Sequence, residues 1–287
     1  MKDFSKYSAI IIGAGDATGA ALTKKFASKG YKVCPARRSR NIEKVNKLAD
    51  DIIRELEDIG IEIKDDVSII TLDDGKVNAF SPDMIKLINE LLDKVPDNRG
   101  SLLIAGREGM FSAGFDLKVM MSNPDNASQM VKSGFEMLLR IFSFPRPVVS
   151  ACSGHAIAMG AFLLCSSDYR IAANGDFKVG ANELRNNMII PTPILEIAKF
   201  KLAKSHKQRA LLNAEMYSIQ DAIEPGYIDE LIEADQLYDV ALAKAKDLGT
   251  LAHPQYDQTK KIDQEDVIKK ISSGIDQIEG VLPRQSL

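Results

Sequence analysis

The 287-residue sequence contains few of the residues that mark metal sites and disulfide-rich folds. It has no tryptophan, only three histidines and only three cysteines, Cys34, Cys152 and Cys165, which are widely spaced and form no Cys-x-x-Cys pair. An odd number of scattered cysteines argues against a disulfide framework and against a zinc site. We therefore expect reduced, buried thiols, no metal and a cytoplasmic location.

The sequence also lacks an excess of charge of either sign and lacks a long apolar run. Thirty-seven Lys and Arg residues face 40 Asp and Glu residues, which gives a net charge of −3 with both signs interspersed. No stretch approaches the roughly 20 apolar residues of a membrane span, and the N-terminal apolar run is too short for a secretory signal. A basic surface for nucleic acid is not expected either. With 45% hydrophobic residues, the chain is predicted to be a soluble globular protein.

The first 59 residues have the pattern of a nucleotide-binding fragment. An apolar run leads into the glycine-rich stretch AIIIGAGDATG at residues 9–19, as a strand, a phosphate-binding turn and a helix do in dinucleotide-binding folds. Two strands cannot close a doubly wound core, so we expect a truncated Rossmann-like appendage. The predicted order is βαβα, over residues 7–13, 16–29, 31–35 and 42–59.

This fragment resembles the start of the short-chain dehydrogenases/reductases. Their phosphate-binding turn appears here with Ala17 in place of its middle glycine. Glycines in the turn would let backbone N–H groups approach a pyrophosphate, and arginines after the second strand could meet the 2′-phosphate of NADP. We interpret these residues as vestigial and expect no bound cofactor. They are Gly13, Gly15, Gly19, Arg37 and Arg38.

The rest of the chain does not continue that resemblance. The Tyr-x-x-x-Lys pair that performs catalysis in short-chain dehydrogenases has one match, Tyr256 to Lys260, without a serine some dozen positions upstream. The βαβ alternation also stops after Ile59. A dehydrogenase that uses the N-terminal unit is therefore a disfavoured alternative.

A second region begins near Ile61, where the pattern of apolar and polar residues changes. Residues 61–81 alternate in the manner of a hairpin, and Pro82 then opens a helix. Strands and helices alternate from there to about residue 232, which indicates a spiral or a parallel sheet. We predict three parts: a Rossmann-like unit over 1–59, an α/β core over 60–232 and a helical segment over 233–287.

Four blocks within the core carry a specific resemblance. VSIITLDDGKVNAFS, GMFSAGFDLKVM, PRPVVSACSGHAIAMGAFLLCSSDYRIA and FKVGANELRNNMIIP follow one another in this order. They resemble the signature blocks of the crotonase family, the enoyl-CoA hydratase/isomerase superfamily. The resemblance implies a crotonase-like ββα spiral core with C-terminal helices, acyl-CoA thioester substrates, and a homotrimer or a dimer of trimers. It implies no cofactor beyond the coenzyme A of the substrate.

Two turns in these blocks are candidates for an oxyanion hole. Phe111–Leu117 and Gly154–Gly160 each join a strand to a helix, where backbone N–H groups have no acceptor of their own. The matched motifs give the N–H groups of Phe115 and Met159 as the donors that would hold the oxygen of a thioester enolate. The same blocks give an acyl-CoA contact set: Asn78, Ser112, Ala113, Gly114, Asp116, Leu117, Gly160 and Phe162.

One carboxylate distinguishes the predicted chemistry. Family members that hydrate a double bond use two glutamates, and Phe162 occupies the position of one of them. Glu183 matches the single catalytic glutamate of the Δ3,Δ2-enoyl-CoA isomerases, which likewise have an apolar residue at the other position. We therefore favour an isomerase in which Glu183 is partly desolvated and moves one proton.

Several other functions stay open at this point. The chain could be an enoyl-CoA hydratase that holds water with one glutamate, or an acyl-CoA thioester hydrolase. It could also be a non-catalytic acyl-CoA binding protein, because Phe162 already replaces one of the two glutamates of the family's hydratases. Glu183 itself could be a solvated acid beside Arg185.

Overall fold

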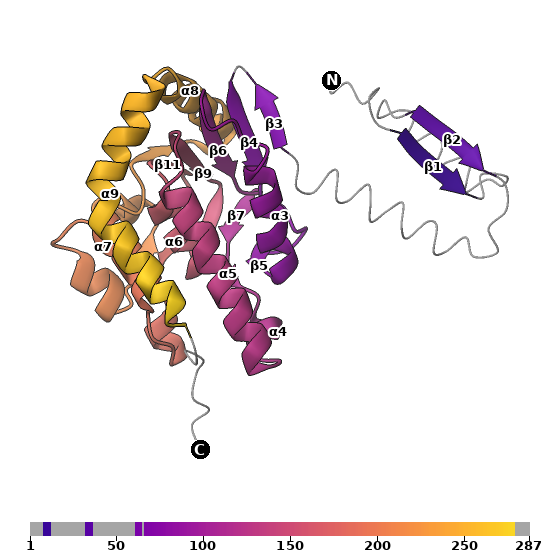
Figure 1. Cartoon of the computed structure of the whole chain (residues 1–287). Coiled ribbons are helices and arrows are strands. Elements are labelled where there is room, and N and C mark those ends of the chain that lie inside the picture. The colour runs from indigo at the N-terminus through magenta and orange to yellow at the C-terminus, as the bar shows by residue number, and fades with distance from the viewer. Residues whose placement is uncertain (1–7, 13–31, 37–60, 65, 279–287) are drawn as a thin grey trace. The chain divides into compact units, whose positions relative to one another are not determined.

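The computed structural model describes residues 8–12, 32–36, 61–64 and 66–278 (Figure 1). The chain divides into two compact units, Met1–Glu57 and Asp58–Leu287. In the first unit, strands β1 (Ser8–Ile12) and β2 (Lys32–Ala36) pair in parallel, where the sequence predicted strands. The two predicted helices of this unit lie outside the described residues, as do Gly13, Gly15, Gly19, Arg37 and Arg38.

A six-stranded sheet forms the centre of the second unit, with the order β14-β11-β9-β6-β4-β3. The predicted hairpin is the antiparallel pair β3 and β4, and all other neighbours in this sheet run parallel. The strands are β3 (Ile61–Lys64), β4 (Val67–Thr71), β6 (Ser101–Ala105), β9 (Val148–Cys152), β11 (Tyr169–Ala173) and β14 (Glu230–Ile232).

A four-stranded sheet and a two-stranded sheet accompany the large one. The four-stranded sheet has the order β13-β12-β10-β7, and β5 pairs with β8. Their strands are β5 (Ala79–Phe80), β7 (Gly109–Ser112), β8 (Gly114–Phe115), β10 (Gly154–Ile157), β12 (Lys178–Gly180) and β13 (Tyr217–Ser218). From β4 onward the chain thus alternates between the sheets, with one strand in the large sheet followed by one or two strands in the small sheets.

Helices complete each turn of this spiral. They are α3 (Pro82–Leu92), α4 (Leu117–Met120), α5 (Pro124–Phe142), α6 (Met159–Ser166), α7 (Thr192–Lys201), α8 (Leu237–Gly249) and α9 (His253–Asp276). Repeated strand–strand–helix turns followed by two C-terminal helices confirm the crotonase-like architecture that the sequence predicted. In Figure 1, α9 runs beside α7 and α5, with which it packs.

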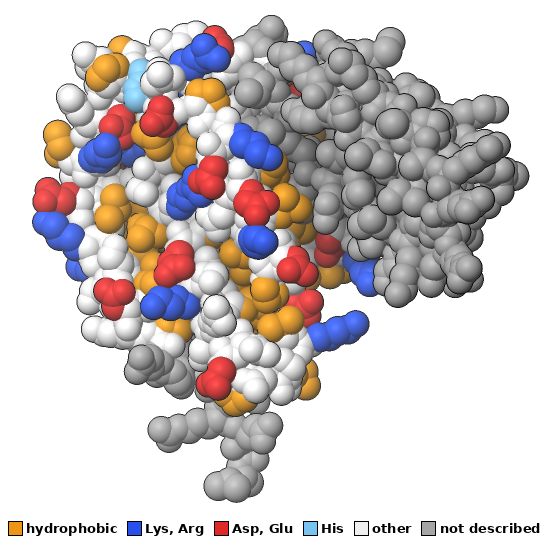
Figure 2. All heavy atoms as spheres, turned by 45° about the vertical axis from the view of Figure 1, so that its right-hand side comes forward, with side chains coloured by type: hydrophobic (Ala, Val, Ile, Leu, Met, Phe, Trp, Pro, Cys, Tyr) orange, Lys and Arg blue, Asp and Glu red, His pale blue; other side chains and the backbone are white. Residues whose placement is uncertain are grey.

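Both faces of the large sheet are covered, which explains its continuous apolar strands. Successive side chains of a strand point to opposite faces. In β6, Leu103 packs in the cluster beneath α8, whereas Leu102 and Ile104 belong to the main core with α3, α5 and α6. The face of the second unit that is visible in Figure 2 carries interspersed acidic and basic side chains, in keeping with the balanced composition.

The Tyr-x-x-x-Lys match has a place in this core. Lys260 of α9 donates to Asp168 Oδ2 at 2.7 Å, and its ammonium group lies 5.8 Å from the centre of the Tyr256 ring. Asp168 Oδ2 also accepts the Val148 N–H at 2.8 Å. The pair therefore fastens α9 to the start of β9 in the large sheet.

Candidate active site

The two predicted oxyanion turns lie against each other. Gly114 has a φ of 99°, and a Cβ on it would lie 3.1 Å from Ala158 Cβ and 3.4 Å from the amide nitrogen of Met159. A Cβ on Gly160 would lie 2.5 Å from the carbonyl oxygen of Ser112. Only glycine allows the backbones to approach this closely, so both glycines bring the end of β7–β8 against the start of α6.

An unusual backbone conformation precedes α6. Ala158 has a φ of 52° and a ψ of −122°, a conformation that costs a non-glycine residue about 1–3 kcal/mol. Its N–H donates to Gly180 O at 3.0 Å, which ties the strained residue to β12. The next N–H, that of Met159, begins the helix, where amides lack an intrahelical acceptor. Alanine gives no sequence signal for this conformation, so Ala158 was not among the predicted residues.

The side chains of the two predicted donors, Phe115 and Met159, both pack against α5. Phe115 packs on α5, where its ring centre lies 5.9 Å from that of Phe135. The methyl group of Met159 lies close to Gly134 of the same helix, 3.2 Å from where a Cβ would be. Both residues are thus held by α5.

Asn78 and Ser112 connect the oxyanion segment to the preceding loop. Asn78 is fully buried, and its side-chain amide donates to Leu72 O at 2.8 Å and to Phe111 O at 3.1 Å. Ser112 Oγ donates to Asn78 O at 2.7 Å and accepts the Gly114 N–H at 3.1 Å. These two predicted contact residues therefore use their side chains to position the turn.

The remaining predicted contact residues of this turn have separate places. Asp116 caps α4, where its Oδ1 accepts the Lys118 N–H at 2.8 Å. The Ala113 N–H donates to Val77 O at 3.0 Å. Leu117 exposes 65% of its surface, so it is an apolar side chain available to a ligand beside the oxyanion segment.

The Glu183 carboxyl is buried beside these turns. Glu183 comes three residues after Gly180, which pairs with Ile157 of β10 just before the strained Ala158. The residue is 7% exposed, and its Oε2 has no hydrogen-bond partner within the described chain. Burial raises the pKa of Glu183 to about 7, although its own backbone N–H opposes the shift. A carboxyl with this pKa suits general-base chemistry near neutral pH.

Glu183 is neither paired with Arg185 nor accompanied by a second carboxylate on α6. Arg185 donates to Ala214 O at 2.6 Å, and Glu183 is not a solvated acid beside it. Phe162 is completely buried on α6, and α6 contains no carboxylate. At position 162, α6 therefore has an apolar wall, the Phe162 ring, and no second carboxylate.

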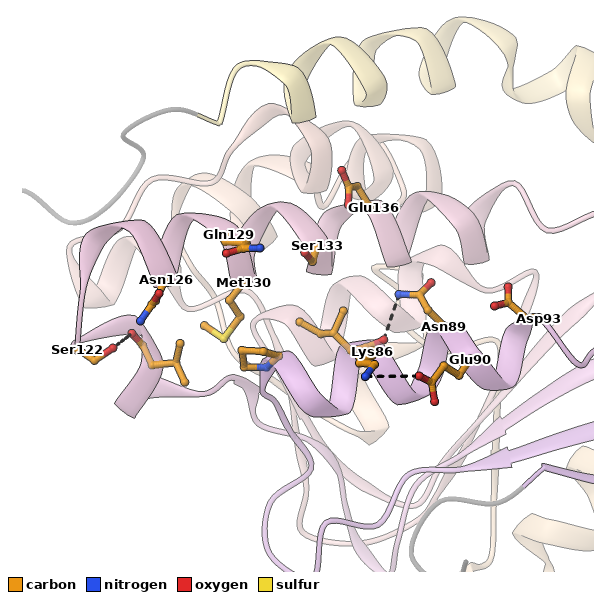
Figure 3. Close-up of a pocket in the computed structure, with 13 residues that line it drawn as sticks. Lys86, Asn89, Glu90, Asp93, Ser122, Asn126, Gln129, Met130, Ser133 and Glu136 are labelled. Atoms are coloured by element: carbon orange, nitrogen blue, oxygen red, sulfur yellow. Dashed lines mark hydrogen bonds and ion pairs between the residues drawn. The ribbon is translucent and has the colours of Figure 1, made fainter. Parts of the chain in front are cut away.

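A groove of about 680 Å³ lies between α3 and α4–α5 (Figure 3). Its inner surface includes the apolar residues Ile85 and Met130, and its rim carries the ion pair between Lys86 and Glu90 at 3.8 Å. None of the predicted site residues lines it.

Neither a metal cluster nor a membrane-spanning helix occurs within the described part of the chain. Among the described residues, no group of three or more His, Cys, Asp and Glu side chains is arranged to hold a metal ion. The helices formed by those residues include none of the length and apolarity needed to cross a membrane.

Comparison with known proteins extends these observations. Residues 62–279 match the model of a family described as enoyl-CoA hydratase/isomerase. The mitochondrial enoyl-CoA delta isomerase 1 of Mus musculus is 26% identical over 234 residues, covering 77% of this chain and 80% of that protein. A probable enoyl-CoA hydratase of Bacillus subtilis is 34% identical over 137 residues, covering 46% of this chain and 52% of that protein.

Solved structures give the same two activities in their names. An enoyl-CoA isomerase from Mtb is 38% identical with a TM-score of 0.74, over 77% of this chain and 97% of the other. An enoyl-CoA hydratase from Mycobacterium marinum is 39% identical with a TM-score of 0.75, over 78% of this chain and 99% of the other. Overall similarity therefore identifies the architecture without choosing between isomerisation and hydration.

Proposed function

Because the chain belongs to the enoyl-CoA hydratase/isomerase family, we propose that it is a Δ3,Δ2-enoyl-CoA isomerase with Glu183 as its only catalytic carboxylate. The observation that carries this proposal is the buried Glu183 carboxyl, which has a free oxygen and a pKa raised to about 7 by burial. Phe162, completely buried on α6, supplies no second acid.

The proposed reaction moves one proton and no other atom. Ionised Glu183 removes a proton from C2 of a 3-enoyl thioester, and the electron pair of the C–H bond forms a dienolate. The N–H groups of Phe115 and Met159 would hold the thioester oxygen, where negative charge accumulates. Glu183 then returns its proton to C4, so the double bond moves from C3–C4 to C2–C3 and the carboxylate is regenerated.

The apolar wall favours isomerisation over hydration. Addition of water requires a water molecule that is held and activated, and two carboxylates do this in the family's hydratases. The Phe162 ring has no hydrogen-bonding group with which to hold that water. Hydration by Glu183 alone remains the second candidate, because relatives of equal similarity are named hydratases.

The variant Glu183→Gln tests this assignment. The amide keeps the shape and polarity of the side chain but cannot accept the proton, so turnover of trans-3-enoyl-CoA should fall by more than about 10²–10⁴-fold. Calorimetry should show binding of a CoA thioester within about threefold of the parent, since no charge needed for binding is removed.

Glu196→Gln is the matched control. It makes the same chemical change on α7, where the carboxylate pairs with Lys199 at 2.9 Å, and turnover should stay at the parental rate. Parental turnover by Glu183→Gln would rule out the proposed role of Glu183.

A further inference from the structure

Tyr227 has a fully buried side chain whose hydroxyl finds no hydrogen-bond partner among the described residues. It follows Gly226, whose φ of 90° turns the chain, and its backbone N–H donates to Ala222 O at 3.0 Å. An unpaired buried hydroxyl is unfavourable, and phenylalanine would fill the same space without that penalty. The polar atom at this position therefore needs an explanation.

The packing of its ring places Tyr227 beside the strand that leads to Glu183. The Tyr227 ring packs at a tilt against the Tyr217 ring, with ring centres 5.9 Å apart and planes at 51°. Tyr217 in turn lies opposite Val179 in the pairing of β13 with β12. Glu183 is the fourth residue after Val179, just past the end of β12 at Gly180, so only a short piece of chain separates the tyrosine pair from the carboxylate.

Several ionisable groups lie near Tyr227. Burial, the Cys165 thiol, the Tyr217 phenol and the Glu183 carboxyl all raise the pKa of Tyr227 well above its usual value, whereas the Ala181 backbone lowers it. Cys165 follows Phe162 by three residues on α6, which puts both on one side of that helix. Tyr227 thus lies near the same side of α6 as the apolar wall and stays protonated at neutral pH.

Glu183 supplies the complementary group. Its Oε2 is buried and without a partner among the described residues, just as the Tyr227 hydroxyl is. We propose that the Tyr227 hydroxyl forms a hydrogen bond to the Glu183 carboxylate through one enclosed water, and so orients the carboxylate toward the substrate. Tyr227 is then a positioning residue of the isomerase reaction, a role that rests on the proposed function.

This hydrogen bond has a consequence for proton transfer. A donor to a carboxylate stabilises the ionised form, so it opposes the rise in pKa that burial causes. A base in the charged form and in one orientation abstracts the C2 proton more readily. Loss of the hydroxyl should therefore raise the pKa of Glu183 and slow the reaction, while the binding of substrate stays unchanged.

The variant Tyr227→Phe tests the proposal, because it removes one oxygen atom and keeps the ring. Tyr217→Phe is the matched control, since that hydroxyl lies 3.5 Å from Glu215 Oε2 instead. Carbon-13 NMR of the side-chain carboxyl groups in the substrate-free protein follows the titration of Glu183 directly. We expect its pKa to rise by about one pH unit in Tyr227→Phe and to stay unchanged in Tyr217→Phe.

Kinetics with trans-3-enoyl-CoA provides the second measurement. In Tyr227→Phe, the acid limb of kcat/KM should move up by the same pH interval, and kcat should fall roughly tenfold at constant KM. Coincident Glu183 titrations in parent and variant would overturn the proposal. A shifted titration in a protein that does not isomerise 3-enoyl-CoA would support the hydrogen bond and refute the isomerase assignment.

Discussion

The two sides of the candidate site are built from different parts of the chain. On the oxyanion side, glycines and the strained Ala158 bring backbone amides together, and the side chains of Phe115 and Met159 pack elsewhere. On the carboxylate side, a single side chain, Glu183, is the proposed reactive group, and burial raises its pKa. The oxyanion side therefore depends on backbone geometry, whereas the carboxylate side depends on the burial of one carboxyl group.

This difference suggests a division of labour within the family. Any thioester reaction that passes through an enolate needs the oxyanion side, so the backbone turns are shared by isomerases and hydratases. The carboxylate side determines which reaction follows, through the number and placement of its acids. Under the proposed assignment, Phe162 leaves the carboxylate side of the present chain with one acid.

The oxyanion side should be the more sensitive to a single methyl group. Gly114→Ala would press a Cβ against Ala158 Cβ at 3.1 Å and Ile157 O at 3.2 Å, which must shift the amides of the turn. Turnover of trans-3-enoyl-CoA should fall by about 10²–10³-fold, as for the loss of one oxyanion donor.

Gly75→Ala is the control for that change. Gly75 also has a positive φ, 71°, but a Cβ there meets no atom within 4 Å. Both variants should lose roughly 1–2 kcal/mol of stability through backbone strain, measured by denaturant unfolding, and only Gly114→Ala should lose turnover. Equal turnover by the two variants would argue against the oxyanion role of this turn.

The raised pKa of Glu183 should make the free energy of unfolding depend on pH. The folded pKa of Glu183, about 7, lies above the unfolded value of 4.5, so the folded state holds this proton more tightly. The stabilisation is complete below pH 4.5 and is lost as pH rises toward 7, by about 3 kcal/mol in total. The free energy of unfolding of the parent should therefore fall by that amount relative to Glu183→Gln between pH 4 and pH 8. Parallel curves for the two proteins would contradict a raised pKa.

The N-terminal unit should contribute least to the reaction. Its predicted phosphate-binding glycines belong to a separate compact unit, Met1–Glu57. Deletion of residues 1–57 should leave acyl-CoA turnover within about tenfold of the parent, because the proposed machinery lies in residues 78–227. A larger loss in a folded variant, or micromolar binding of NADPH to the intact chain in calorimetry, would contradict the interpretation as a vestigial appendage.

The sequence predicted the backbone side of the site better than the carboxylate side. Glycines at 114 and 160 mark close approaches that only glycine permits, so the meeting of the two turns could be inferred from the sequence motifs. The conformation of Ala158 could not, because alanine has no preference for a φ of 52°. It is imposed by the strands and helix on either side.

Long-range packing explains what else was missed. Asp168, next to the start of β11, joins Val148 to Lys260 of α9, contacts that a local sequence pattern does not contain. Tyr227 stood out in no motif, and its importance depends on which groups surround it in the fold. The burial of Glu183 followed from its apolar neighbours in sequence, whereas the unpaired state of its Oε2 depends on how distant segments pack around it.

The most direct test of the single-carboxylate account compares two substrates on the unmodified protein. Purified protein is given trans-3-enoyl-CoA and trans-2-enoyl-CoA of equal chain length, and isomerisation and hydration are measured side by side. With Glu183 as the one proposed carboxylate and Phe162 in place of a second acid, the account predicts isomerisation at least about 10²-fold faster than hydration. Hydration as fast as isomerisation, or faster, would contradict it.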